Sequence, residues 1–429
     1  MTAVVVPVSG IVHVTGMSES RGFYDLHDAS NGDYSSGSLE ALLATIAITI
    51  VSCLVASRRL PEESAAIGKL TGSRKPDPGL DQRQLRFCSR AAIVLIPISA
   101  VSVLAMKAFA EETGSSRIVQ VDGGMARYAF LSHWFAWGVA FLAIWLALGA
   151  FQNIPKAKVA TVLVAVALIA WSLDWTGGRS IIAVLGLPIV LALLPQIRRY
   201  AKFALTTLVA AAVITMVSIS RTRAEGYRSS EAFSIPAVLD WQWGRFSMLG
   251  FAAENVKTNG YMFGETVLSG VMSVPNGILT LIGVDLFPQL RSSMEITGQE
   301  ILGDPSQKYI LPGLAGELYL NFGILGVIVL HYVLGRLANA ADDKFRAADT
   351  ELERLIYGYW GTLLVLSTVP AQSGAIFNYG LFSGLPIIVA WVYMSQKSSK
   401  TADGVNVAGI KRHNNASDHN VKFETSVRN

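Results

Sequence analysis

Long apolar stretches recur along this chain, with short polar segments between them. Each stretch is about 17–23 residues long, the length at which an α-helix spans the hydrocarbon core of a bilayer. Helices are predicted over residues 39–57, 91–110, 128–150, 159–175, 180–197, 203–219, 314–335, 355–370 and 376–394. The pattern therefore predicts an all-α, polytopic membrane bundle of about nine or ten transmembrane helices.

The composition agrees with this pattern. Of 429 residues, 52% are hydrophobic and 15% are charged, and the mean hydropathy is +0.43. Soluble domains carry about 25% charged residues, so the composition excludes both a soluble enzyme and a disordered chain. The two cysteines, Cys53 and Cys88, form neither a disulfide pattern nor a metal-binding pattern.

The positive charges predict how the bundle is oriented. Segment 58–90, after the first predicted helix, holds eight Lys and Arg residues, and basic loops stay in the cytoplasm. Counting helices from there places most basic residues inside, with the N-terminus outside and the C-terminus in the cytoplasm. We therefore expect an extracytoplasmic tail over 1–38, a membrane domain over 39–394 and a disordered cytoplasmic tail over 395–429. Whether residues 1–16 form a helix stays open.

One predicted outer segment, 220–313, is far longer than the usual connection, and such loops are usually functional. Within it, residues 261–290 are semi-apolar but interrupted by Pro, Gly, Asn and acidic residues. A lipid-facing span would not tolerate those interruptions, so this stretch is expected to be an interfacial or re-entrant helix.

Cationic side chains gather on the predicted outer side. The guanidinium group is permanently charged and binds phosphate oxygens in a bidentate manner, so these residues suit a lipid pyrophosphate. They could equally pair with nearby acids or lipid headgroups. The basic residues of the segment are Arg221, Arg223, Arg228, Arg245, Lys257, Arg291 and Lys308.

Three further features are candidates for the chemistry. Arg179 follows two glycines in a very short outer hairpin, where it binds phosphate or is an ordinary arginine at a helix start. Glu317 begins a predicted helix; it is either stabilised by the helix dipole or orients an arginine or accepts a sugar proton. Glu265 is a second candidate for that role. Three aromatic residues could stack on sugars or anchor the membrane interface: Trp241, Trp243 and Tyr261.

Nucleotide and metal motifs are missing. The chain has no Walker loop, dinucleotide fingerprint, HExxH or Asp-x-Asp pair. We therefore expect no cofactor and no metal, and any transfer reaction must use a donor that carries its own leaving group.

Several short motifs occur in an order that resembles a known family. They are Thr176-Gly-Gly-Arg-Ser180, Trp243-Gly-Arg-Phe246, Tyr261-Met-Phe-Gly-Glu-Thr266 ahead of Pro275, and Gly316-Glu-Leu-Tyr-Leu-Asn-Phe-Gly-Ile-Leu-Gly326. Over roughly 40–394 the chain is similar to the Wzy-type polymerases of bacterial O-antigen, capsule and exopolysaccharide repeat units. It departs from them in lacking a full N-terminal helix and in the residues after Pro275.

The resemblance implies a GT-C-like membrane glycosyltransferase in the bacterial inner membrane with its site on the outer face. The reaction it implies is transfer of a growing glycan from undecaprenyl pyrophosphate to a lipid-linked repeat unit. Arg179, Arg245 and Glu317 match family positions, and Arg221 and Arg223 match more loosely. Expected partners are undecaprenyl-pyrophosphate-linked oligosaccharides, membrane lipids, a chain-length regulator and a flippase, and no nucleic acid.

Two other functions are weighed against the polymerase. A lipid-linked glycan ligase typically uses a histidine in the large outer loop, and residues 220–313 contain none. A transporter or flippase of lipid-linked sugars often shows internal repeats and broken helices near the membrane midplane. No repeat is found in the sequence, and its polar residues are concentrated in one outer loop.

Overall fold

The computed structural model describes residues 38–57, 78–113, 126–173, 179–193, 246–281, 290–302, 312–367 and 373–395. All regular secondary structure in these ranges is helical, which confirms the all-α prediction. The predicted helix 203–219 lies outside the described residues, as do nearly all of the two predicted tails, 1–38 and 395–429.

Four described helical stretches are long and apolar enough to cross a membrane. They are Gln82–Phe109 within α5 (Pro78–Thr113), Leu131–Ala150 within α7 (Ala126–Trp145) and the π-helix η3 (Leu146–Ala150), α8 (Pro155–Leu173), and α15 (Gly313–Ala347). A bent pair, Ser373–Ser383 and Leu385–Ser395, is a fifth candidate. The chain is thus a helical membrane protein.

Fewer candidate spans than the predicted nine are found in the described part of the chain. Two predicted spans are described in part: α9 (Arg179–Leu193) has 15 residues and α16 (Glu351–Ser367) has 17, and the residues that follow each of them lie outside the described part of the chain. The first predicted span forms α3 (Ser38–Ser57), whose apolar part is Leu43–Val55.

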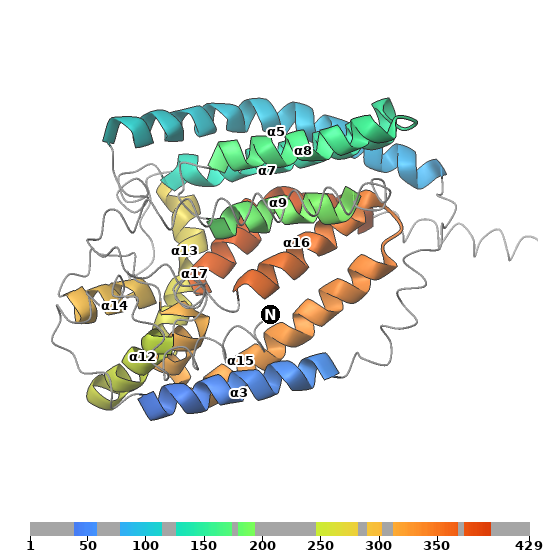
Figure 1. Cartoon of the computed structure of the whole chain (residues 1–429). Helices are drawn as coiled ribbons and strands as arrows, with labels where there is room; N and C mark the ends of the chain where they lie inside the picture. Colours follow the sequence, from blue (N-terminus) through green and yellow to red (C-terminus); the bar gives the residue numbers. More distant parts are fainter. Residues whose placement is uncertain are drawn as a thin grey trace, which may run out of the picture.

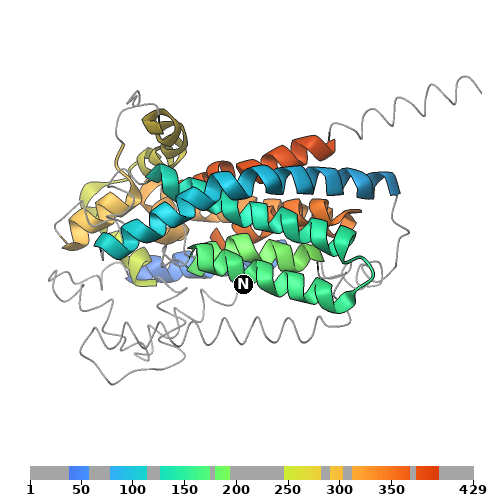
Figure 2. The same ribbon diagram turned by 90° about the horizontal axis from the view of Figure 1, so that it is seen from above.

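The helices form layers. In the view of Figure 1, α5, α7 and α8 lie at the top, α9 and α16 lie in the middle, and α15 and α3 lie at the bottom. Contacts join α5 to α7, α9 to α16, and α3 to α15. The main core surrounds α7, where Trp137, Phe141 and Ile144 are fully buried. Figure 2 shows the same elongated bundle from above.

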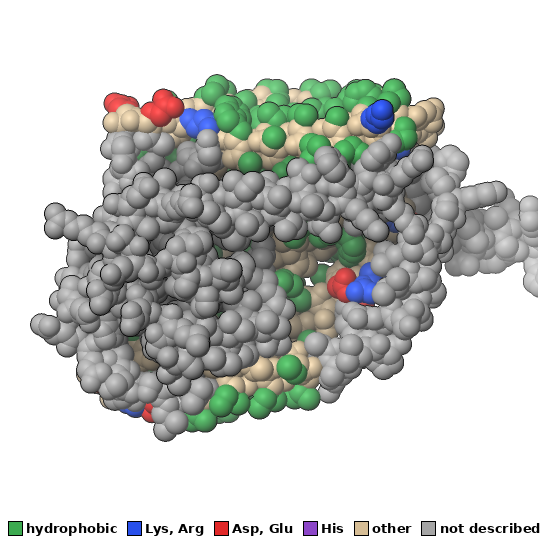
Figure 3. Space-filling view, in the orientation of Figure 1, with side chains coloured by type: hydrophobic (Ala, Val, Ile, Leu, Met, Phe, Trp, Pro, Cys, Tyr) green, Lys and Arg blue, Asp and Glu red, His purple; other side chains and the backbone are tan. Residues whose placement is uncertain are grey.

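The outer face of α5 is apolar and exposed. Its exposed side chains recur at helical spacing and include Ile93, Val94, Ile98, Val101 and Leu104. Figure 3 shows hydrophobic side chains along the middle of the uppermost helices and charged side chains towards their ends. A water-soluble surface rarely carries such a continuous patch, whereas lipid acyl chains would cover it.

The described part of one predicted loop, residues 78–90, and most of a second, 336–354, are helical, so the loop prediction is wrong for these residues. Helix α5 begins at Pro78, inside the predicted loop 58–90, because proline suits the first turn of a helix. Helix α15 runs to Ala347 and α16 begins at Glu351, which reduces the predicted loop 336–354 to three residues.

A capping box makes this short connection possible. The Glu353 backbone N donates to Thr350 Oγ1 (3.2 Å), and the Thr350 backbone N donates to Glu353 Oε2 (3.2 Å). The buried Gln84 of α5 adds a second cap, because its Oε1 accepts a hydrogen bond from the Leu352 backbone N (3.2 Å).

The last predicted helix, 376–394, is not continuous. The chain forms α17 (Ser373–Phe377), the π-helix η7 (Asn378–Ser383) and, after Gly384, the helix Leu385–Ser395, with a bend of 55°. Pro386 has no N–H to donate to the Phe382 carbonyl one turn earlier.

Side chains of α7 replace the missing backbone donors. Trp134 Nε1 donates to the Phe382 carbonyl (2.9 Å), and Trp137 Nε1 donates to the Ser383 carbonyl (2.5 Å). His133 Nδ1 lies 2.7 Å from Ser383 Oγ. The break is therefore stabilised by specific partners within the core.

Candidate functional site

The long predicted outer segment contributes three described helices. They are α12 (Phe246–Asn259), α13 (Glu265–Leu281) and α14 (Ser293–Leu302). Figure 1 places these helices and α17 at one end of the bundle, near the start of α15. Helix α13 lies within the stretch 261–290, as predicted, and contains Pro275.

Four predicted site residues have described side chains: Tyr261, Glu265, Arg291 and Glu317. Arg179 is the first residue of α9, but its side chain lies outside the described part of the structure. The remaining predicted site residues also lie outside it: Arg221, Arg223, Arg228, Trp241, Trp243 and Arg245. The predicted convergence of arginines therefore stays a prediction.

The turn before α13 is bonded to α15. The Met262 backbone N donates to the Leu320 carbonyl (3.0 Å). The Gly264 backbone N donates to Asn321 Oδ1 (2.8 Å), and Asn321 Nδ2 donates to Thr266 Oγ1 (2.6 Å). Asn321 is fully buried, so this single amide fixes the position of the chain just before and just after Glu265.

Two glycines bring these segments into close contact. Gly264 (φ +95°) lies under the ring of Phe322, and Gly323 (φ +64°, ψ −158°) lies under the ring of Tyr261. A Cβ atom at Gly323 would lie 2.9 Å from Tyr261 Oη. Each segment thus supplies a glycine that the other segment covers with an aromatic ring, and α15 departs from helical geometry at Gly323.

The carboxylate of Glu317 is at the centre of a buried polar cluster. The residue is 1% exposed. Glu317 Oε2 accepts a hydrogen bond from the Ser373 backbone N (2.6 Å), and Oε1 accepts one from Ser373 Oγ (2.8 Å). The hydroxyls of Thr266 and Ser293 also bond to this carboxylate. Glu317 therefore joins the start of α17 to α13, α14 and α15.

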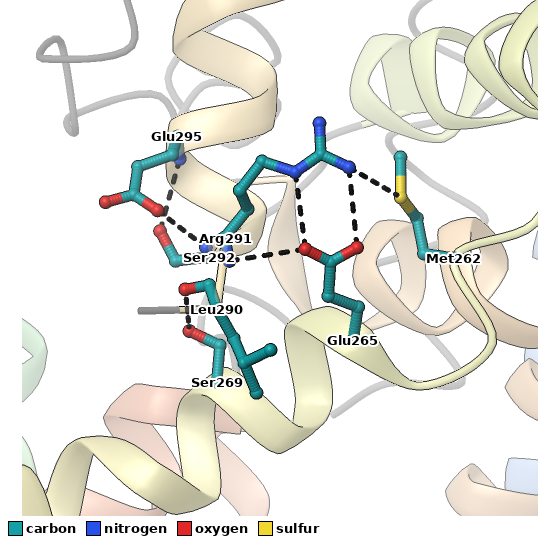
Figure 4. Close-up of polar contacts among 7 residues, drawn as sticks. All are labelled: Met262, Glu265, Ser269, Leu290, Arg291, Ser292 and Glu295. Atoms are coloured by element: carbon teal, nitrogen blue, oxygen red, sulfur yellow. Dashed lines mark hydrogen bonds and ion pairs between the residues drawn. The ribbon is translucent and has the colours of Figure 1, made fainter. Parts of the chain in front are cut away.

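Glu265 lies nearer the surface and forms an ion pair with Arg291 (Figure 4). Arg291 Nε lies 3.3 Å from Glu265 Oε1, and Arg291 Nη2 lies 3.4 Å from Glu265 Oε2. The exposed fraction of the side chain is 62% for Arg291 and 29% for Glu265. The guanidinium and part of the carboxylate can therefore reach a bound molecule.

Local bonds hold the backbone on both sides of Arg291. The Ser292 backbone N donates to Glu295 Oε2 (2.7 Å) and the Glu295 backbone N donates to Ser292 Oγ (3.2 Å), forming the capping box of α14. Ser269 Oγ of α13 donates to the Leu290 carbonyl (3.0 Å). Figure 4 shows these contacts around the ion pair, which aim Arg291 at Glu265.

This arrangement suits acid–base and anion-binding chemistry. A partly exposed carboxylate can take a proton from a hydroxyl group, and an exposed guanidinium can bind a phosphate oxygen or a hydroxyl. Among the described residues, no group of three or more His, Cys, Asp or Glu side chains could hold a metal ion.

Four residues of this cluster were not predicted from the sequence: Thr266, Ser293, Asn321 and Ser373. Thr266 and Asn321 lie inside two of the motifs that carried the resemblance, so their place in those motifs could have identified them as site residues. Ser373 had no such signal, because only the fold brings it to Glu317, 56 residues away along the chain.

Comparisons with known proteins give no further assignment. The chain matches no family model, and searches of curated proteins and of solved structures return no match. The resemblance to the repeat-unit polymerases stays a prediction.

Proposed function

We propose that this protein is a membrane glycosyltransferase that polymerises oligosaccharide repeat units carried on undecaprenyl pyrophosphate. In this proposal it has a GT-C-like fold and lies in a bacterial inner membrane with its N-terminus outside and its C-terminus in the cytoplasm. The end of the bundle that holds α12, α13 and α14 faces outwards, where it meets its lipid-linked substrates.

One observation carries the proposal: two motifs on which the resemblance rests interlock in space. Segments 261–266 and 316–326 are joined by Asn321, by a backbone hydrogen bond and by the two glycine–aromatic contacts. Next to them lies the Glu265–Arg291 pair. These motif residues therefore support one another around a carboxylate and a guanidinium that a substrate can reach.

The proposed reaction assigns different roles to the two carboxylates. An acceptor hydroxyl oxygen attacks the anomeric carbon of the donor glycan, and its proton passes to Glu265. The bond from the anomeric carbon to oxygen breaks, and undecaprenyl pyrophosphate leaves with the electron pair. Glu317, which is buried and hydrogen-bonded, positions the segment that carries Glu265.

The leaving group requires positive charge. We assign that role to Arg179 and Arg245, assisted by Arg221 and Arg223, because preorganised cations stabilise the charge that develops on a departing pyrophosphate. Arg228 belongs to the same basic group, and Trp241, Trp243 and Tyr261 supply rings for the sugars. Arg291 orients Glu265 and contacts the acceptor.

The test is reconstitution of the purified chain in liposomes with lipid-linked repeat units. Wild-type protein should lengthen the glycan, and Arg245→Ala and Glu265→Gln should prevent this. Arg346→Ala is the matched control, because Arg346 pairs with Asp342 near the opposite end of α15 and should leave elongation intact. Full elongation by Arg245→Ala would contradict the proposal.

A second candidate, a flippase or transporter of lipid-linked sugars, is favoured by the broken helix at η7. Transporters place substrate sites at discontinuous helices, and the chain bends by 55° there. Movement of lipid-linked repeat units across liposome membranes by the purified protein, without chain growth, would select this function.

A further inference from the structure

Phe263 has an unusual backbone conformation and an unusual exposure. Its φ of +47° makes it the one residue other than glycine with positive φ among those that the structure describes. Bulky residues rarely adopt this conformation, which costs about 1–3 kcal/mol and occurs preferentially at functional sites. Its side chain is nevertheless 83% exposed, so burial of the ring does not compensate for the strain.

Hydrogen bonds on both sides of Phe263 maintain this conformation. The preceding residue, Met262, donates its backbone N–H to the Leu320 carbonyl, and the following residue, Gly264, donates its N–H to Asn321. The two neighbours are thus fixed to α15 while the ring between them projects outwards. The Tyr261 ring stands edge-on to the Phe263 ring, with the centroids 6.2 Å apart.

The turn that carries Phe263 leads directly into a charged pair. Glu265, paired with Arg291, follows Phe263 by two residues. Sites for polar organic ligands combine an apolar wall with a few convergent hydrogen-bonding groups. Sugars suit such a site, because their C–H faces contact an aromatic ring and their hydroxyls bond carboxylates and guanidinium groups.

We propose that Phe263 is the stacking surface for a sugar ring of the acceptor glycan, next to the Glu265–Arg291 pair. This inference rests on the proposed function and names the acceptor site within it. The ring places a sugar face against the turn, and Arg291 and Glu265 hold its hydroxyl groups.

Anchoring in lipid is the competing explanation for an exposed aromatic ring. Interfacial anchors are typically Trp and Tyr, whose polar atoms meet the headgroups. An anchoring phenylalanine would need neither a left-handed backbone nor a position two residues from an ion pair. These features favour a sugar ligand.

The backbone conformation allows a sharp test. Phe263→Gly and Phe263→Asn remove the ring and put residues that tolerate positive φ at this position, so both variants should fold at least as well as wild type. Phe263→Tyr keeps the ring. Leu325→Ala is a matched control for loss of exposed apolar surface, because Leu325 of α15 is also highly exposed.

The probe is the oligosaccharide pool released by mild acid from cells that lack this protein and accumulate lipid-linked repeat units. Saturation-transfer NMR with the full chain in lipid nanodiscs reports binding, and thermal unfolding reports stability. Phe263→Gly and Phe263→Asn should weaken binding about tenfold, the loss of one ring contact. Phe263→Tyr and Leu325→Ala should bind as wild type does.

Unchanged binding by Phe263→Gly would overturn the inference. If Phe263→Gly and Leu325→Ala both lower thermal stability while binding is unchanged, the ring is a lipid anchor. These measurements distinguish failure of the sugar-stacking inference from failure of the proposed function. If the wild-type protein binds the oligosaccharide pool through Phe263 but never elongates a glycan, only the proposed polymerase function is contradicted. Normal elongation with unchanged acceptor KM in Phe263→Gly would contradict only the stacking role.

Discussion

The carboxylate of Glu317 accepts two hydrogen bonds from Ser373, one from the backbone N (2.6 Å) and one from the hydroxyl (2.8 Å). Glu317 lies in α15 and Ser373 begins α17, so the pair connects two elements of the bundle. Ser373 also packs closely against α13, because a Cβ atom at Gly270 of that helix would lie 2.3 Å from Ser373 Oγ. The relationship explains how the start of α17 is held against the proposed site.

Replacing Glu317 tests whether it positions the site or reacts. Glu317→Ala would leave the Ser373 N–H without this acceptor and the Ser373 hydroxyl with only the longer contact to the Thr266 carbonyl (3.5 Å), which should lower the free energy of unfolding by about 1–3 kcal/mol. Glu317→Gln keeps one acceptor oxygen and should cost less. Unfolding in detergent micelles measures both losses.

The role of Glu317 in the reaction is read from elongation. If it positions Glu265, Glu317→Gln should retain partial elongation with the wild-type pH profile, whereas Glu265→Gln should lose it. Complete loss in Glu317→Gln, in a folded protein, would instead make Glu317 the base.

The Glu265–Arg291 pair should matter for activity far more than for stability. An exposed ion pair contributes about 0–1 kcal/mol, so Glu265→Gln should hardly change thermal unfolding. Loss of a general base should slow elongation by about 10²–10⁴-fold. The reversed pair, Glu265→Arg with Arg291→Glu, is the control. It should restore the attraction without restoring elongation, and an active reversed pair would show that the charges serve only the fold.

Gly323 should not tolerate a side chain. Its φ and ψ (+64°, −158°) fall in a region that is essentially restricted to glycine, and a new Cβ would contact Tyr261 Oη. Gly323→Ala should lower the free energy of unfolding by at least about 1–3 kcal/mol. Adding Tyr261→Phe should recover part of that loss, since the nearest atom is removed while the backbone strain persists.

Gly186 of α9 provides the matched comparison for Gly323. A Cβ atom there would meet nothing within 4 Å. Because alanine favours helix by about 0.5–1 kcal/mol over glycine, Gly186→Ala should leave the protein as stable or more stable in the same unfolding experiment. Equal effects of Gly186→Ala and Gly323→Ala on the free energy of unfolding would contradict the geometry described for Gly323.

Trp134 and Pro386 should be energetically coupled. Trp134→Phe would remove the indole hydrogen bond to the Phe382 carbonyl, at a cost of about 0.5–1.5 kcal/mol, the net contribution of a typical hydrogen bond. In a Pro386→Ala background the backbone N–H returns, so Trp134→Phe should cost less. A double-mutant cycle measures this coupling, and additive losses would show that the indole does not replace the missing donor.

Some features of the fold could be predicted from the sequence because they depend on neighbouring residues. The apolar stretches at 91–110, 128–150, 159–175 and 314–335 predicted the helices that are long enough to span a membrane. The basic residues at 58–90 and 336–354 predicted cytoplasmic loops there. At 336–354 the caps from Thr350 and Gln84 start α16 only three residues after α15, and Gln84 comes from a distant part of the chain.

The sequence by itself determined that this is a helical membrane protein and which carboxylates and arginines were candidates, because apolar length and charge are local properties. Only the tertiary structure decided that Glu317 is buried against Ser373 while Glu265 meets Arg291 near the surface. The two carboxylates are both near helix starts in the sequence. Their burial and partners depend on how α13, α14, α15 and α17 pack, and no local pattern contains that information.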